Sequence, residues 1–286
     1  MSDTTPAPVA YIHPSSAVEQ RRLLDQAERL APLTCRLLRD AGIAPGIRVL
    51  DLGCGLGDVS LLAAALVGPR GAVLGVDRDA SFLAVARARA AERGLAAVAF
   101  AEADVHDLSA LADRPPFDAL VGRAILGHLP DPAAVVRAAA RLVCPGGIIA
   151  FQEADITLTE LTVARSPSEL LRRVLGWFAV GHPRFGKRLP RAMLDLPATF
   201  REAGLPTPHL RSTTELGVGG EAYLLTQLVE ILRSLLPVYE RLGVVTAAEV
   251  EIETLEARLR TELAAVDPTG VLAAWSFVDA WAITAA

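Results

Sequence analysis

Three alternating glycines follow a short apolar run in Val49-Leu-Asp-Leu-Gly-Cys-Gly-Leu-Gly57. Glycine lets a backbone turn tightly while a ligand lies almost on the main chain, so this segment is typical of a nucleotide-binding turn. About 20 residues further on, Asp77 ends a second apolar run, where a carboxylate can accept hydrogen bonds from both hydroxyls of a ribose. The alternative for Asp77 is a helix N-cap for the segment that starts near Ala80. The spacing favours a nucleoside site.

Asp104 offers a second carboxylate after a third apolar run, in Ala101-Glu-Ala-Asp-Val105. A carboxylate beside a backbone amide can form hydrogen bonds with the edge of an adenine. A solvated loop residue is the alternative for Asp104. If the runs are parallel strands, both carboxylates lie at the same edge of the sheet, where ligands bind.

Groups that could accept a proton follow the fourth and fifth apolar runs. His128 lies in Leu126-Gly-His-Leu129, and a neutral imidazole can take a proton near pH 7. Glu153 and Asp155 follow the fifth run and could orient a hydroxyl or an amine. A packed histidine and solvated carboxylates are the alternatives. His182, in the basic and aromatic segment 181–188, is a weaker candidate.

Short apolar runs alternate with helical patterns along the first half of the chain. Strands are expected at 48–52, 72–77, 97–101, 117–122 and 147–152, with helices between them at 58–67, 80–93 and 132–143. A helix over 17–41 precedes them, with a break near Pro32 left open. This alternation implies a parallel sheet that carries helices on both faces.

The second half of the chain has longer helical patterns. Two further strands are expected at 207–216 and 271–283, and between them helices at 221–242 and 247–265. The expected fold is therefore α/β, with a doubly wound, mostly parallel seven-stranded sheet, an N-terminal helical cap and a helical insertion between the last two strands. An insertion of this size can form a roof over a pocket.

Composition narrows the class of protein. Over 286 residues the net charge is −5, with 28 basic and 33 acidic residues that form no dense basic run, so we expect no nucleic-acid partner. The cysteines Cys35, Cys54 and Cys144 lie far apart and have no metal-ligand spacing, which indicates a reducing cytoplasm and no metal site. No segment has the length or apolarity of a signal peptide or a membrane span.

Five motifs, in order over 48–155, resemble those of the class I, Rossmann-like methyltransferases that use S-adenosyl-L-methionine. They are Asp51-Leu-Gly-Cys-Gly-Leu-Gly57, Gly75-Val-Asp77, Ala103-Asp-Val105, Phe117-Asp-Ala-Leu-Val-Gly-Arg123 and Leu142-Val-Cys-Pro-Gly-Gly147. The resemblance implies an N-terminal leader and cap helix over 1–45, a cofactor-binding core over 46–165, and the rest of the sheet with a helical lid (221–265) over 166–286.

The resemblance also assigns residues to the donor. From the methionine end to the adenine these are Asp51, Arg123, Gly53, Gly55, Asp77, Arg78, Asp104 and Val105. Arg123 would present its backbone carbonyl to the methionine ammonium, which Asp51 would support. Asp104 would bind the adenine amine and Val105 a ring nitrogen, while the Arg78 stem could lie along the adenine or remain solvated. The Arg123 side chain could simply make a surface ion pair, and its role stays open.

We therefore expect a methyltransferase for a small, hydrophobic metabolite such as a natural product, with His128 or Glu153 as the catalytic group. The accepting atom and the oligomeric state, including a homodimer, stay open. One alternative is a methyltransferase fold that binds the cofactor but catalyses other chemistry or regulates. The other is a nicotinamide-dependent oxidoreductase, which is disfavoured because Gly57 follows Gly55 by two positions where the dinucleotide motif has three.

Overall fold

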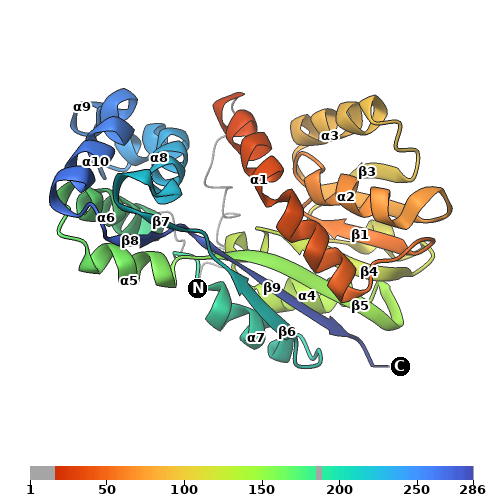
Figure 1. Cartoon of the computed structure of the whole chain (residues 1–286). Coiled ribbons are helices and arrows are strands. Elements are labelled where there is room, and N and C mark those ends of the chain that lie inside the picture. The colour runs from red at the N-terminus through yellow and green to blue at the C-terminus, as the bar shows by residue number, and fades with distance from the viewer. Residues whose placement is uncertain (1–16, 185–188, 286) are drawn as a thin grey trace, which may run out of the picture.

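A computed structural model describes residues 17–184 and 189–285 (Figure 1). Seven strands form the main sheet: β1 Arg48–Leu52, β2 Ala72–Asp77, β3 Val98–Glu102, β4 Phe117–Arg123, β5 Val143–Asp155, β6 His209–Thr213 and β9 Ser276–Ile283. Their order is β3-β2-β1-β4-β5-β9-β6, and β9 runs in the direction opposite to the other six strands. The predicted fold class is confirmed.

Some helices of the described chain pack on the two faces of the sheet, and others form a separate apolar unit beyond it. The helices are α1 Ala17–Ala41, α2 Asp58–Val67, α3 Ala80–Glu92, α4 Pro132–Ala140, α5 Thr157–Arg165, α6 Glu169–Arg184, α7 Ala192–Glu202, α8 Tyr223–Arg241, α9 Ala247–Val250 and α10 Ile252–Val266. Apolar side chains of α1 and α2 pack on one face of the sheet, and those of α4 and α7 pack on the other. The result is a three-layer α/β/α core, with α1 continuous through Pro32.

The last two predicted strands are each divided in the structure. Segment 207–216 gives β6 and the start of β7 (Leu216–Val218), and segment 271–283 gives β8 (Val271–Ala273) and β9. β7 and β8 pair only with each other, as a separate two-stranded sheet. The predicted helix 247–265 is also divided, because Glu251 has a left-handed backbone with φ of 48° between α9 and α10.

The inserted helices form a second hydrophobic cluster, which we call the lid. Its buried residues come from α5, α6, α8, α9, α10 and β8. β5 leads directly into α5, and β9 starts beside the end of β5, so the lid lies beyond the carboxyl end of β5 (Figure 1). The lid is larger than the predicted range 221–265, since α5 and α6 also pack in it.

Polar side chains from four neighbouring strands are hydrogen-bonded across the face under α1. In strand order they are Arg123 of β4, Gln152 of β5, Asp279 of β9 and Arg211 of β6. Gln152 donates to Asp279 over 2.7 Å, and Arg211 donates to Asp279 over 2.8 Å. Thr34 of α1 donates to Gln152 over 2.7 Å and accepts from Arg123 over 3.0 Å. These buried bonds fix α1 on the sheet, next to the glycine turn.

Candidate active site at the carboxyl edge of the sheet

The glycine turn connects β1 to α2. Gly53, Gly55 and Gly57 all have left-handed backbones, with φ of 65°, 52° and 83°. Residues with a side chain rarely adopt this conformation, so the sequence needs glycine here. The backbone N–H of Cys54 donates to the Val76 carbonyl over 2.9 Å and holds the turn against β2.

The three glycines have different surroundings. A Cβ atom on Gly53 would lie 2.6 Å from Cδ1 of Ile125, and one on Gly57 would lie 2.9 Å from Cβ of Ala86. Among the described residues, no atom beyond the chain neighbours of Gly55 lies within 4 Å of such a Cβ. Gly53 and Gly57 are therefore also required by packing, whereas Gly55 faces open space that a ligand could use.

Asp77 ends β2 directly beside the glycine turn. Its Oδ2 accepts from the Gly55 N–H over 2.8 Å, and its Oδ1 accepts from the Asp79 N–H over 2.9 Å. Each oxygen keeps a lone pair for a ribose hydroxyl, so the carboxylate fits the predicted role. The alternative N-cap role belongs to Asp79, whose side chain accepts from the N–H groups of Ser81 and Phe82.

Replacing Asp77 with alanine is expected to cost about 1–3 kcal/mol of donor binding free energy, because two ribose bonds to a carboxylate disappear. Calorimetry with S-adenosylhomocysteine measures the loss. Asp79→Ala is the matched control, since it removes a neighbouring carboxylate that caps α3 and should leave the affinity unchanged. Equal affinities of Asp77→Ala and the parent chain would mean that the ribose is held elsewhere.

The predicted adenine loop lies beside Asp77. The Ala103 N–H donates to the Asp77 carbonyl over 3.0 Å, which fixes the loop after β3 next to β2. Asp104 is exposed and accepts from the His106 N–H over 2.9 Å, while Val105 is partly buried. Arg78 is exposed. The adenine roles of these residues stay predictions.

Asp51 is buried at the end of β1 and has spare acceptor capacity. Its Oδ2 accepts from the Ser60 hydroxyl over 2.5 Å, and its Oδ1 has no hydrogen-bond partner among the described residues. Burial raises the pKa of Asp51 to about 7, against the lowering effects of Ser60 and Arg123. A buried carboxylate oxygen without a partner is costly, and a methionine ammonium or a water held by it would relieve that cost.

Replacing Asp51 with asparagine is expected to change stability in a pH-dependent way. Burial raises the pKa of Asp51 from 3.8 to about 7 in the folded chain. The protonated carboxyl therefore stabilises the fold fully below the unfolded pKa, and this stabilisation is lost as the pH rises through about 7. The amide does not titrate, so the variant should gain in free energy of unfolding relative to the parent from pH 5 to pH 8. Urea unfolding at both pH values measures this gain, and a constant difference would contradict the assignment.

The Arg123 side chain is buried and points toward α1 and α2. It donates to Thr34, and its Nη2 lies 3.5 Å from Asp58, the first residue after the glycine turn. Arg89 of α3 lies 2.6 Å from the same carboxylate. The guanidinium therefore joins β4, α1 and α2, and this settles its side chain as structural rather than as a surface ion pair. Sequence reasoning missed Asp58, Arg89 and Thr34, because their pairing depends on tertiary contacts.

The candidate proton acceptors lie at the carboxyl ends of two neighbouring strands, and Glu153 and Asp155 belong to β5 itself because this strand continues past the predicted end at 152. His128 ends the short helix η3 (Leu126–His128) after β4 and is partly buried. Glu153 is buried, and its carboxylate accepts from the N–H groups of Ile125 and Leu126, both over 2.9 Å. Burial raises the pKa of Glu153 to about 7 although these backbone bonds lower it. Asp155 accepts from the N–H groups at the starts of α5 and α7.

The segment predicted as a basic turn starts inside a helix. α6 continues to Arg184, and residues 185–188 lie outside the described part of the chain. His182 is buried in the lid, where its Nδ1 lies 3.1 Å from the Phe178 carbonyl oxygen and 3.0 Å from the Tyr239 hydroxyl. Desolvation lowers the pKa of His182 to about 4. His182 is therefore a packing residue of the lid.

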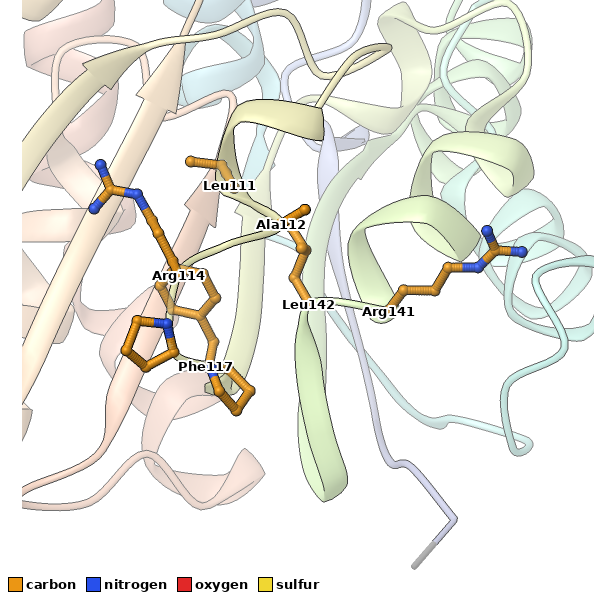
Figure 2. Close-up of a pocket in the computed structure, with 8 residues that line it drawn as sticks. Leu111, Ala112, Arg114, Phe117, Arg141 and Leu142 are labelled. Atoms are coloured by element: carbon orange, nitrogen blue, oxygen red, sulfur yellow. The ribbon is translucent and has the colours of Figure 1, made fainter.

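Two hollows in the described part of the chain are lined by residues other than the candidate site residues. One of about 150 Å³ surrounds the start of β4, and the side chains of Arg114 and Arg141 point out of it in opposite directions (Figure 2). The other, of about 560 Å³, is a wide cleft between α1 and α8. None of the described helices is long and apolar enough to span a bilayer.

The sequence is similar to known methyltransferases. A model of the methyltransferase domain matches residues 43–176. A ubiquinone biosynthesis O-methyltransferase of Paracidovorax citrulli is 38% identical over 59% of this chain and 68% of its own length. A trans-aconitate 2-methyltransferase of Methylobacterium nodulans is 38% identical over 58% of this chain and 56% of its own length. An arsenite methyltransferase of Aquipseudomonas alcaligenes is 36% identical over 60% of this chain and 52% of its own length. The chain thus spans about half to two thirds of the length of these relatives.

Solved structures share the fold. A SAM-dependent methyltransferase of Aquifex aeolicus aligns over 70% of this chain and 93% of its own, with a TM-score of 0.50 and 16% identity. The [4+2]-cyclase SpnF aligns over 89% of this chain and 80% of its own, with a TM-score of 0.54 and 20% identity. A phosphoethanolamine N-methyltransferase of Haemonchus contortus, solved with S-adenosylhomocysteine, aligns over 89% of this chain and 53% of its own, with a TM-score of 0.53 and 17% identity. These structural matches show the fold, and together with the sequence relatives they show that the chain belongs to the class I S-adenosylmethionine-dependent methyltransferase family.

Proposed function

We propose that this methyltransferase methylates a small, hydrophobic metabolite of the natural-product kind. The observation that carries the proposal is the position of the lid, an apolar helical unit beyond the carboxyl end of β5. Ligands of open α/β sheets bind at that edge, and an apolar cover there favours an apolar acceptor.

The donor supplies a methyl group that is already activated on a sulfonium, so the chain's main tasks are to position the acceptor and to exclude water. Gly55 leaves room for the methionine portion, and Asp77 holds the ribose. The buried oxygen of Asp51 is suited to the ammonium, directly or through water. α1, which is hydrogen-bonded to the sheet through Thr34, lies over the same edge and would limit access of water.

In this proposal His128 is the general base, which removes the proton from the substrate atom that receives the methyl group whenever that atom is protonated. Asp155 uses both of its oxygens for backbone N–H groups, at Thr157 and Met193. Glu153 is bound to backbone in the same manner. We take the imidazole rather than either carboxylate as the base because His128 ends η3 at the edge where ligands of such sheets bind, and a base must reach the proton it takes.

The names of the relatives include a quinone pathway, a carboxylic acid and arsenite. Thiolates are the preferred ligands of soft centres such as trivalent arsenic. Cys54 is at the carboxyl end of β1, Cys144 is near the amino end of β5, and Cys35 is on α1. Because Cys54 and Cys144 lie at opposite edges of the sheet, these three thiols cannot share one arsenic, and an organic acceptor is favoured.

Incubation of the chain with methyl-labelled S-adenosylmethionine and a panel of acceptors tests the proposal. The panel should contain apolar phenols, apolar amines, tricarboxylic acids and arsenite. We expect label in the apolar acceptors. Label only in tricarboxylic acids or arsenite would contradict the hydrophobic substrate class. Tight binding of the donor without transfer to any acceptor would favour non-methylating chemistry.

A further inference from the structure

The carboxylate of Glu153 is bound to the loop that follows β4. Its Oε1 accepts from the N–H groups of Ile125 and Leu126, each over 2.9 Å, and its Oε2 lies 3.5 Å from the N–H of Gly127. Three consecutive backbone donors thus converge on one side chain, which is only 6% exposed. These bonds satisfy N–H groups that the start of the short helix η3 would otherwise leave without acceptors.

The loop needs such a support because its backbone is strained. Ala124, directly before the three donors, has φ of 52°, in the left-handed region that disfavours residues with a Cβ. Its N–H donates to the Gln152 carbonyl over 2.9 Å. Strained residues persist where surrounding contacts hold them, and here the contacts come from Gln152 and Glu153, two successive residues of β5.

The loop after β4, which Gln152 and Glu153 hold in place, contacts the glycine turn. The side chain of Ile125 fills the space beside Gly53, where a Cβ would lie 2.6 Å from it. Leu126 is buried in the core of the sheet. His128 lies at the other end of η3. A change in the path of this loop would therefore move Ile125 against the glycine turn and would move His128 as well.

We propose that Glu153 is a positioning residue: by accepting from Ile125 and Leu126 it sets the loop against the glycine turn, so that donor affinity depends on Glu153 without contact between them. This inference rests on the proposed function, because it takes the glycine turn as the donor site. It replaces the expectation that Glu153 acts as a catalytic group.

Two substitutions separate hydrogen-bond acceptance from proton transfer. The amide oxygen of Glu153→Gln can still accept from both N–H groups on Oε1, whereas Glu153→Ala removes the acceptor. We expect Glu153→Ala to raise the Kd for S-adenosylhomocysteine at least tenfold, and Glu153→Gln to stay within about threefold of the parent in Kd and in turnover. Calorimetry gives the first quantity and methyl transfer gives the second.

Glu262→Ala is the matched control. Glu262 accepts from the Leu170 N–H over 3.2 Å and from the Ser168 hydroxyl over 2.9 Å at the start of α6, in the lid. Its loss removes a carboxylate from backbone donors without touching the loop after β4, so the Kd should stay within about twofold. Thermal unfolding of each variant separates a general loss of stability from a loss of affinity.

An unchanged Kd in folded Glu153→Ala would overturn the inference. So would a loss of turnover by about 100-fold or more in Glu153→Gln with unchanged Kd, since that result identifies a proton acceptor. If Glu153→Ala does not fold, Glu153→Gln alone decides between positioning and proton transfer. Failure of the parent chain to bind S-adenosylhomocysteine would instead overturn the proposed function, and this inference with it.

Discussion

Replacing His128 with alanine is expected to lower turnover by about 10²–10⁴-fold while the affinity for S-adenosylhomocysteine stays nearly unchanged. The reason is its location, since His128 ends η3, which follows β4 at the carboxyl edge of the sheet, and it is close in sequence to the predicted donor contact at Arg123. A general base in the transition state contributes to the rate and not to donor binding. Single-turnover methyl transfer and calorimetry measure the two quantities.

The pH profile of turnover adds a second readout for His128. An imidazole base should give an acidic limb near about pH 6–7 that vanishes in His128→Ala. His106→Ala, at an exposed loop position, is the control and should keep both the limb and the rate. If turnover of His128→Ala stays within a few-fold of the parent, catalysis needs no base at this position and rests on proximity. A parallel loss of stability and donor affinity would identify a structural histidine.

Replacing Gly55 with valine is expected to abolish donor binding, with a Kd for S-adenosylhomocysteine raised by at least 100-fold. In the described part of the chain, a Cβ on Gly55 would meet no atom within 4 Å beyond its chain neighbours, so valine would extend into the space that the methionine portion needs. Valine would also be strained at φ of 52°. Calorimetry together with a circular-dichroism spectrum separates lost binding from lost fold.

Gly94 offers a control that matches Gly55 in backbone and space. Its φ is 63°, and it follows α3, away from the glycine turn. No atom of the described residues beyond its chain neighbours would lie within 4 Å of a Cβ added to Gly94. Gly94→Val carries the same backbone strain, so it should lose stability and keep donor affinity. Normal binding by Gly55→Val would show that the turn is only structural.

The core of the fold could be predicted because each of its elements has a local signal. The first strand was predicted with the bounds that the structure gives, Arg48–Leu52, because an apolar run there ends at a glycine turn. Segment 271–283 was wrongly taken as one strand. Its two parts are both apolar, and only tertiary pairing shows that 271–273 (β8) pairs with β7 while 276–283 (β9) joins the main sheet. No periodicity separates strands that belong to different sheets.

At the candidate site too, residues with a local sequence signal could be predicted, and those whose role depends on tertiary contacts could not. Asp77 could be found because its spacing from the glycine turn is fixed by one strand-helix-strand unit. Glu153 could be placed at the correct edge, but the sequence does not show that the N–H groups of Ile125 and Leu126 face it. His182 was misplaced for a similar reason. Its partner Tyr239 lies 57 residues away, and the helix α6 includes Pro183.

A crystal structure of the chain with S-adenosylhomocysteine tests the central claim most directly. We predict that the methionine portion crosses Gly55, that both ribose hydroxyls donate to Asp77, and that the sulfur faces a space bounded by His128 and the lid. A ligand bound elsewhere, such as in the cleft between α1 and α8, or a ribose with no contact to Asp77, would contradict the account.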